Sequence, residues 1–457
     1  MSSTPASESK TTGGNYRWVI CGLLFALVAL SYIDRLIIGI LKKPIGQELG
    51  WSEVDYGNIA AGFSFAYAFG YLFAGRAIEW LKVKRGLPLF VFVWSLAVAA
   101  HGLISYMGKA EMLRIHYPWF SFAEKGFAWM TLAMPLTAAG FIFARIILGL
   151  AEGANFPAAI RTVAVWFPVK ERAYATGWFN AGTNIGAVFC PFVVPWIYVH
   201  LGWPLTFYLT GAGGVAWLIA WWWLYDEPEN HPRLSNAELD YIRSGQPPTV
   251  EKTVKVPWLS LLRYRSVWAY IVASILAGPA WGFYQFFVPD FLEKRFHLGL
   301  LETGYWTGGF FALTAFGGIG GGWLAGWLIG RGWQLNNARK LTLLICALCV
   351  LPVFYAPFAG TVLAAVLIVG LAGAAHQGWS ANLFSVVSDT MPRDAISSVI
   401  GMGGFVAYFT GGFVNGFTGH ILQQTGSYVW VFAYFSDMYI FSLIAIQLLV
   451  PKIKSQD

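Results

Sequence analysis

Long apolar stretches separated by short polar segments dominate the pattern of hydrophobic and polar positions along this chain. Each stretch holds about 20 residues, the length of helix that crosses the hydrocarbon core of a bilayer. The pattern therefore predicts twelve membrane-spanning helices. We place them at approximately 17–41, 54–78, 87–106, 131–165, 173–199, 204–225, 266–292, 302–330, 340–357, 359–387, 396–422 and 428–450.

The order of these stretches predicts an all-α polytopic membrane protein with two pseudo-symmetric six-helix halves. A polar linker divides them, and within it Ser235 to Glu238 has the capping-box pattern that should open a short helix through Ile242. The glycines 318, 322, 326 and 330 predict close helix packing in the eighth stretch. The expected units are a tail (1–16), an N-terminal bundle (17–225), a cytoplasmic linker (226–265), a C-terminal bundle (266–450) and a second tail (451–457).

Composition and charge placement support a membrane protein. Only 12% of the residues are charged and 57% are hydrophobic, whereas soluble proteins carry about 25% charged residues. Most of the 30 Lys and Arg residues fall on the side that holds both termini. By the positive-inside rule, this placement predicts a multi-pass protein of the cell inner (plasma) membrane with both termini cytoplasmic. The net charge of +7 thus reflects topology in the lipid bilayer, and we expect no nucleic-acid partner.

Charged side chains inside the fourth apolar stretch indicate a transport pathway. Arg145 and Glu152 are seven residues apart, so they lie on one face of a helix. Ionised groups at membrane depth face a bundle interior or a water-filled path. Arg145 and Glu152 could form a permanent structural bridge, or protonation of Glu152 could free Arg145 and let the helix repack. Asp34, in the first stretch, is a second candidate for carrying the proton.

Several local motifs resemble those of the major facilitator superfamily, and within it the anion:cation symporter family. They are Tyr32-Ile33-Asp34-Arg35, the run from Arg145 to Arg172, Phe179 to Gly186, and His231 to Ile242. Four segments are similar to hexuronate transporters in particular, namely Phe179 to Gly182, Pro279 to Gly282, Gly373 to Gln377 and Ser388-Asp389. One departure concerns the loop that usually reads G-x-x-x-D-x-x-G. It has Gly75, Glu79 and Lys82 here, and Lys82 in place of glycine calls the usual tight turn into question.

The resemblance implies that the substrate is a small organic anion, commonly a polyhydroxylated carboxylate. Arg35 is the first candidate to bind a carboxylate, because a guanidinium offers paired donors in one plane. A single histidine such as His376 is more often a packed polar residue than a proton carrier, and it lacks a second ligand at metal spacing. The expected substrate-binding residues are Arg35, Tyr32, Tyr67, Asn180, Thr183, Asn184, Trp281, Gln285, His376 and Gln377, and the expected coupling residues are Asp34, Glu152 and Arg145.

These features predict a secondary active transporter that couples protons to symport of a sugar-acid anion, a hexuronate such as glucuronate or galacturonate, by alternating access. The alternatives are symport of another organic anion (galactonate, glucarate or an aromatic carboxylate) and, further off, export or antiport. Exporters of this superfamily carry a Gly-rich segment in the fifth stretch. The corresponding residues here, Gly186 to Val193, lack that pattern. We see no catalytic apparatus, so we expect no enzyme, no cofactor and no metal; the protein should act as a monomer.

Overall fold

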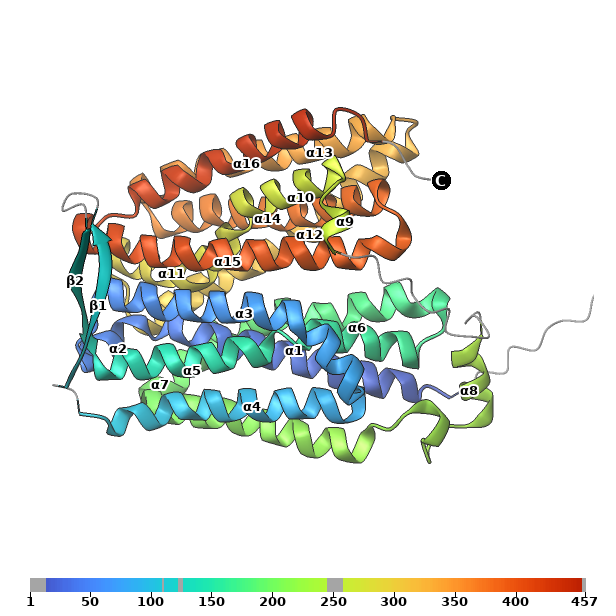
Figure 1. The fold of residues 1–457 in the computed structure, drawn as a ribbon, viewed down its shortest axis with the longest axis horizontal. Helices are drawn as coiled ribbons and strands as arrows, with labels where there is room; N and C mark the ends of the chain where they lie inside the picture. The colour runs from blue at the N-terminus through green and yellow to red at the C-terminus, as the bar shows by residue number, and fades with distance from the viewer. Residues whose placement is uncertain (1–13, 109–110, 122–125, 245–257, 454–457) are drawn as a thin grey trace, which may run out of the picture.

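The computed structural model of the chain describes residues 14–108, 111–121, 126–244 and 258–453. Long helices run side by side along one axis, and a two-stranded sheet covers one end of them (Figure 1). We call this the hairpin end. The opposite end carries the short helix α8 (Asn236–Arg243) of the polar linker, and we call it the linker end.

The helices form two halves, the first in the lower part of Figure 1 and the second in the upper part. The first half comprises α1 (Tyr16–Ile40), α2 (Lys42–Leu49), α3 (Glu53–Leu81), α4 (Val83–Leu103), α5 (Leu136–Glu152), α6 (Asn155–Trp166) and α7 (Arg172–Leu224). The second comprises α10 (Arg265–Ala277), α11 (Pro279–Phe296), α12 (Leu300–Gly330), α13 (Leu335–Val350), α14 (Val362–Thr390), α15 (Arg393–Thr425) and α16 (Val429–Leu449). Short elements complete the set: α9 (Trp258–Leu261), η1 (Ile104–Tyr106), η2 (Val169–Glu171), η3 (Pro228–Asn230) and η4 (Leu351–Phe358).

The helices account for the twelve expected spans. In the described part of the chain, nine helical segments are long and apolar enough to cross a membrane. One of them, Val169–Leu224, contains two spans, because Gly202 interrupts α7 with φ 80° and ψ 166°. The nine segments therefore contain ten spans. Helices α3 and α15, of 29 and 33 residues, provide the remaining two.

The two halves meet mainly along two pairs of helices, α3 with α15 and α7 with α12, and α1 also contacts α11. Near the hairpin end the first pair approaches closely: a Cβ atom on Gly57 would lie 3.0 Å from the Cα atom of Gly419. Such contacts need glycine because a side chain would hold the backbones apart. The interface between the halves is therefore tightest toward the hairpin end.

A β-hairpin replaces the beginning of the predicted fourth span. Strands β1 (Met112–Ser121) and β2 (Gly126–Pro135) pair antiparallel, from Met112 opposite Pro135 to Ser121 opposite Gly126. The prediction that the span begins at 131 is therefore wrong, since α5 begins at Leu136. The apolar residues of β2 extended the hydrophobic run, and hydrophobicity alone does not separate a strand from a helix.

The linker helix α8 confirms the prediction that a short helix opens at Ser235, but the described structure shows only half of a capping box, because the Glu238 carboxylate binds Arg17. The Ser235 hydroxyl accepts a hydrogen bond from the backbone N–H of Glu238, 3.2 Å away, and the helix follows directly. Glu238 in turn forms an ion pair with Arg17 at the start of α1, with 3.2 Å between Oε1 and Nη1. Arg17 also bonds Glu171, at 3.0 Å between Nε and Oε2. Helix α8 is thus fastened to the first half.

The glycines of α12 pack on a different line from the one that we predicted. A Cβ atom on Gly321 would lie 2.4 Å from the Cα atom of Gly378, and one on Gly317 would overlap the backbone of Ala374. By contrast, nothing lies within 4 Å of such an atom on Gly322, Gly326 or Gly330. The close contact with α14 therefore runs one residue before the predicted line, and the prediction of the packing face is wrong.

In the loop between α3 and α4, Lys82 adopts a backbone conformation that is usual for glycine. Lys82 has φ 59° and ψ 154°, a conformation that costs about 1–3 kcal/mol for a residue with a side chain. The corresponding loop of the second half, between α12 and α13, has Gly332 at φ 86°. The side chain of Glu79, the acidic residue of this motif, lies outside the described part of the structure.

Candidate functional site

A cavity of about 560 Å³ lies between the two halves. Helices α1, α3, α6 and α7 line it from one side, and α10, α11, α14 and α15 from the other. The wall continues from the middle of α1 toward Thr176, near the start of α7, and Phe384, near the end of α14. Seven of the predicted substrate-binding residues line it: Tyr32, Tyr67, Asn180, Thr183, Trp281, His376 and Gln377.

Arg35 and Glu152 form a buried ion pair behind this wall. The Arg35 Nη2 and Nε atoms lie 3.0 Å and 3.3 Å from the Glu152 Oε2 atom. Both residues are buried, with 2% and 0% of their surface exposed. The guanidinium carbon of Arg35 lies 4.9 Å and 4.6 Å from the ring centres of Tyr32 and Tyr67. Since both rings line the cavity, Arg35 is one layer away from it.

The partner of Glu152 differs from the one that the sequence suggested. Residues seven apart on a helix lie about 10 Å apart along its axis, whereas α1 brings Arg35 into direct contact with Glu152. Arg145 instead donates from Nη1 to the carbonyl oxygen of Arg35, at 3.4 Å. Its Nε and Nη2 atoms have no hydrogen-bond partner among the described residues. The hypothesis of an Arg145–Glu152 bridge is therefore replaced by an Arg35–Glu152 pair.

Asp34 belongs to a separate contact in the same half. Its Oδ2 atom accepts a hydrogen bond from the indole nitrogen of Trp94 at 2.7 Å. Its side chain thus bonds a neutral group on α4, although Arg35 is adjacent in sequence. Asp34 is 3% exposed, and its Oδ1 atom has no hydrogen-bond partner in the described structure. The first half therefore buries two carboxyl groups close to two arginines.

Aromatic and neutral polar side chains make the second half's wall. The His376 ring stacks on Trp281, with 5.6 Å between ring centres and 4° between planes. His376 Nδ1 lies 2.5 Å from the hydroxyl oxygen of Tyr439. Among the described lining residues, the second half contributes no Asp, Glu, Lys or Arg.

Three predicted binding residues are not part of the cavity wall: Arg35, Asn184 and Gln285. Gln285 is 1% exposed and lies where α11 contacts α1. Its backbone carbonyl oxygen is so near Gly39 that a Cβ atom added to that glycine would lie 2.8 Å from it. Lining residues that we did not predict include Ser64, Tyr71, Tyr270, Trp379, Ser380 and Tyr408. Helical spacing could have found Tyr71 and Ser380, four residues after Tyr67 and His376. Tyr270 and Tyr408 carried no such signal.

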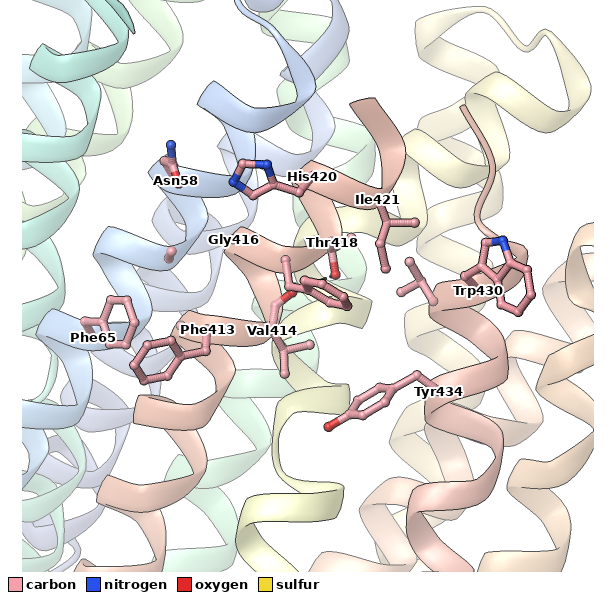
Figure 2. A pocket seen from close by; sticks show the side chains of 14 residues that line it. Asn58, Phe65, Phe413, Val414, Gly416, Thr418, His420, Ile421, Trp430 and Tyr434 are labelled. Atoms are coloured by element: carbon pink, nitrogen blue, oxygen red, sulfur yellow. Dashed lines mark hydrogen bonds between the residues drawn. The ribbon is translucent and has the colours of Figure 1, made fainter. Parts of the chain in front are cut away.

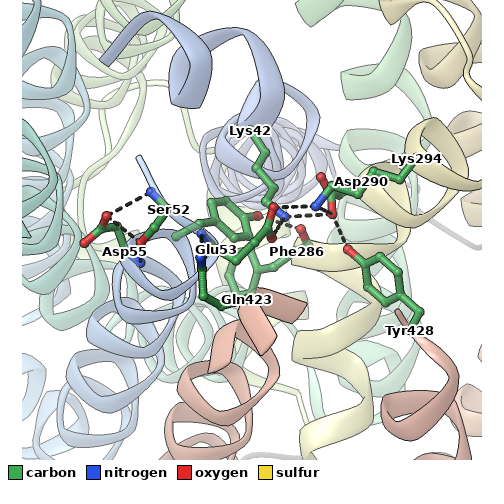
Figure 3. Close-up of polar contacts among 10 residues, drawn as sticks. Lys42, Ser52, Glu53, Asp55, Phe286, Asp290, Lys294, Gln423 and Tyr428 are labelled. Carbon is green, nitrogen blue, oxygen red and sulfur yellow. Dashed lines mark hydrogen bonds and ion pairs between the residues drawn. The ribbon is translucent and has the colours of Figure 1, made fainter. Parts of the chain in front are cut away.

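Charged side chains close the hairpin end between the halves (Figure 3). Lys42 Nζ lies 2.6 Å from Glu53 Oε2 and 2.7 Å from Asp290 Oδ2. Lys294 forms ion pairs with both acids and lies 3.2 Å from Asp290 Oδ2. The hydroxyl of Tyr428 also donates to Asp290. Lys42 and Glu53 belong to the first half and the others to the second, so these bonds hold the halves together.

Further contacts reinforce this closure. Lys43 forms an ion pair with Glu293 across the same interface. We call Lys42, Lys43, Glu53, Asp290, Glu293 and Lys294 the hairpin-end ion network. Beside it, the hydroxyl of Tyr56 donates to the carbonyl oxygen of Phe286 at 2.6 Å. The structure is thus closed at the hairpin end, while the cavity extends toward the linker end.

A second cavity, of about 600 Å³, is lined by the side chains drawn in Figure 2. Its lining comes from α3, α15 and α16 and is mostly apolar. Phe413, Phe417 and Trp430 form its rim, with 61%, 64% and 66% of their surface exposed. None of the predicted substrate-binding or coupling residues lines it. We therefore place the candidate site in the central cavity.

Comparisons with known proteins agree with this arrangement. The chain is 28% identical to the hexuronate transporter of Escherichia coli K12 over 397 residues, 86% of this chain and 84% of the relative. It is 29% identical to the galacturonate transporter of Dickeya chrysanthemi over 288 residues, 63% of this chain and 74% of the relative. The crystal structure of the D-xylose-proton symporter superposes with a TM-score of 0.71 at 12% identity, covering 96% of this chain and 99% of the other.

These findings confirm the predicted fold class, with twelve membrane-spanning helices in two six-helix halves, and the resemblance to hexuronate transporters. Relatives of this kind move solutes across membranes, so the chain is a multi-pass transporter and not an enzyme. The model of the Major Facilitator Superfamily matches residues 24–416, most of the chain. This chain belongs to the Major Facilitator Superfamily.

Proposed function

We propose that this protein is a proton-coupled symporter that carries a hexuronate anion, such as glucuronate or galacturonate, by alternating access. The buried Arg35–Glu152 pair behind the cavity wall is the observation that carries this proposal. A sugar acid needs a fixed positive charge for its carboxylate and hydrogen-bonding groups for its hydroxyls. Arg35 provides the charge, and the polar residues of the wall provide the hydrogen bonds.

Coupling follows from competition for Arg35. With Glu152 ionised, its carboxylate accepts both hydrogen bonds that Arg35 donates. Protonation of Glu152 removes that negative charge, and Arg35 then loses its partner in a poorly solvated place. A substrate carboxylate can take over as a bidentate acceptor. Proton and anion thus enter together, because an uncompensated buried arginine costs several kcal/mol.

Tyr32 and Tyr67 control access to Arg35 in this scheme. Their rings lie over the guanidinium and also form the cavity wall. The substrate carboxylate reaches Arg35 once these rings turn aside, and the two hydroxyls can then bond the bound anion. Asp34, which bonds Trp94, is the second site at which a proton could be taken up.

The direction of the cavity gives the conformational state. The positive-inside pattern assigns the linker end to the cytoplasm and the hairpin end to the outside of the inner membrane. The cavity extends toward the linker end, so the state is closed outside and inward-facing. To accept substrate from outside, the halves must break the hairpin-end ion network and separate there.

Uptake into membrane vesicles tests the proposal. Vesicles containing the protein should accumulate labelled glucuronate or galacturonate when the inside is more alkaline, and a protonophore should abolish accumulation. Galactonate, glucarate and an aromatic carboxylate should compete weakly. Accumulation that ignores both the pH gradient and the protonophore would exclude proton symport, and stronger uptake of a competing anion would reassign the substrate.

A further inference from the structure

His376 is held in place by three helices of the second half. It projects from α14, its ring stacks on Trp281 of α11, and its Nδ1 atom contacts the hydroxyl of Tyr439 on α16. Tyr439 is fully buried and does not line the cavity. On the other side of the ring, Nε2 lies 3.5 Å from the hydroxyl oxygen of Ser380, a cavity-lining residue. The two nitrogens therefore face different surroundings.

The contact with Tyr439 selects one tautomer of the imidazole. A phenol O–H is a stronger donor than an imidazole N–H, and an imidazole nitrogen is a stronger acceptor than a phenol oxygen. The short bond therefore runs from the Tyr439 hydroxyl to Nδ1, and the ring keeps its proton on Nε2. Nε2, next to Ser380 in the cavity wall, is thereby a hydrogen-bond donor.

We infer that Tyr439 is a positioning residue that fixes His376 as a hydrogen-bond donor to an oxygen atom of the bound sugar acid. The inference rests on the proposed function, because it assigns part of the same site. It assigns to the second half the orientation of one hydrogen-bond donor toward the substrate. The Trp281–His376 stack fixes the plane of the ring, and Tyr439 fixes which nitrogen carries the proton.

This arrangement bears on which hydroxyl configuration the site accepts. Uronates such as glucuronate and galacturonate have the same charge and size, and they differ in the direction of one hydroxyl group. A fixed donor favours the isomer that places an oxygen opposite it, since a buried donor left without an acceptor loses binding energy. An imidazole free to exchange tautomers could serve either a donor or an acceptor, and it would discriminate less.

The test uses Tyr439→Phe, which removes the hydroxyl and keeps the ring that packs against Trp379 at 5.4 Å. We expect about a fivefold loss in affinity for the preferred uronate, together with a smaller ratio between the two isomers. Transport rates at saturating substrate should change little. Tyr284→Phe is the matched control, because the Tyr284 hydroxyl has no hydrogen-bond partner in the described structure; it should bind like the unmodified protein.

A second background separates positioning from packing. In His376→Gln the amide nitrogen can donate from nearly the place of Nε2 without any help from Tyr439. Adding Tyr439→Phe there should cost nothing further if Tyr439 acts through the imidazole. An equal loss of affinity in both backgrounds would make Tyr439 a packing residue and overturn the inference.

Nitrogen-15 NMR of histidine-labelled protein gives a readout that needs no substrate. The chain has seven histidines, and the signals of His376 are those missing from His376→Gln. We expect a single Nε2-protonated form that becomes a mixture in Tyr439→Phe. An Nδ1-protonated form, or no change in the variant, would overturn the inference. If the unmodified protein bound no sugar acid while this change still occurred, the proposed function would fail and the positioning by Tyr439 would stand.

Discussion

The two halves of this transporter have similar architecture and different chemistry around the central cavity. The first half buries two arginines and two carboxyl groups next to the cavity, with an ion pair between Arg35 and Glu152. The second half faces it with an aromatic stack and a histidine whose partner is a tyrosine. In the mechanism that we propose, placing the buried arginines and carboxyl groups in one half lets protonation change the interactions within that half. The other half can then keep a fixed surface for substrate recognition.

Replacing Glu152 by Gln should have the largest effect, because it removes the group that we expect to carry the proton. Gradient-driven accumulation should vanish, while counterflow of labelled substrate should persist, since a carrier fixed in the protonated form can still reorient when loaded. Parallel accumulation and counterflow assays in vesicles check this.

A structural role for Glu152 predicts a different pattern. Loss of the carboxylate would then leave Arg35 buried without its partner, at a cost of about 3–5 kcal/mol. Protein yield, binding and both transport modes would fall together. Normal accumulation would contradict both roles and move the coupling proton to Asp34.

Arg35→Lys should reduce substrate affinity by about 100-fold although it keeps the charge. A lysine cannot offer the paired, planar donors that a carboxylate accepts from a guanidinium. Equilibrium binding of labelled uronate measures the loss. Arg295→Lys is a suitable control, since Arg295 donates to the carbonyl of Pro357 at 2.7 Å, at the end of α11. Unchanged affinity in Arg35→Lys would remove Arg35 from the site.

Asp290→Asn should weaken the closure between the halves at the hairpin end. It leaves Lys42 and Lys294 with one shared acid, Glu53. The outward-open population should rise at least about tenfold, because Asp290 pairs with Lys42 in a buried position and only Glu53 remains to replace it. A cysteine in place of Gln285, with the native cysteines removed, reports this as faster labelling by a membrane-impermeant thiol reagent.

The exposed pair of Glu229 and Arg243 gives the control for that experiment. Both side chains are 53% exposed, and pairs of this kind contribute little. Glu229→Gln should therefore leave the labelling rate unchanged. Equal labelling rates in Asp290→Asn and the unmodified protein would show that the hairpin-end ion network does not hold the closed state.

The smallest expected effect concerns the loops that follow α3 and α12. Lys82→Gly should stabilise the protein by about 1 kcal/mol, because relief of the strain at φ 59° outweighs the entropy that glycine loses on folding. Gly332→Ala, at φ 86° in the second half, should destabilise it by a similar amount. Thermal unfolding in detergent measures both. A lower unfolding temperature for Lys82→Gly would mean that the lysine side chain makes a contact worth more than the strain.

Most of the fold could be predicted from the sequence because the signals are local. A membrane span must satisfy its own backbone hydrogen bonds and be apolar along its length. Each span can therefore be recognised from a stretch of about 20 residues. The N-terminal cap of α8 is likewise contained in four residues, Ser235 to Glu238. The hairpin of β1 and β2 was missed because an apolar strand beside an apolar helix reads as one continuous stretch.

Which side chains meet was decided by the tertiary structure. The sequence identified Arg35, Glu152, Arg145 and Asp34 as groups that must avoid lipid, since burying charge is costly wherever the partner is. It could not pair Glu152 with Arg35, 117 residues away on another helix. The same holds for Tyr439, which contacts His376 from 63 residues away and looks in sequence like any tyrosine of an apolar helix. The type of a residue determines the free-energy cost of burying its polar group. Only the packing of the helices determines which neighbouring side chain compensates for that cost.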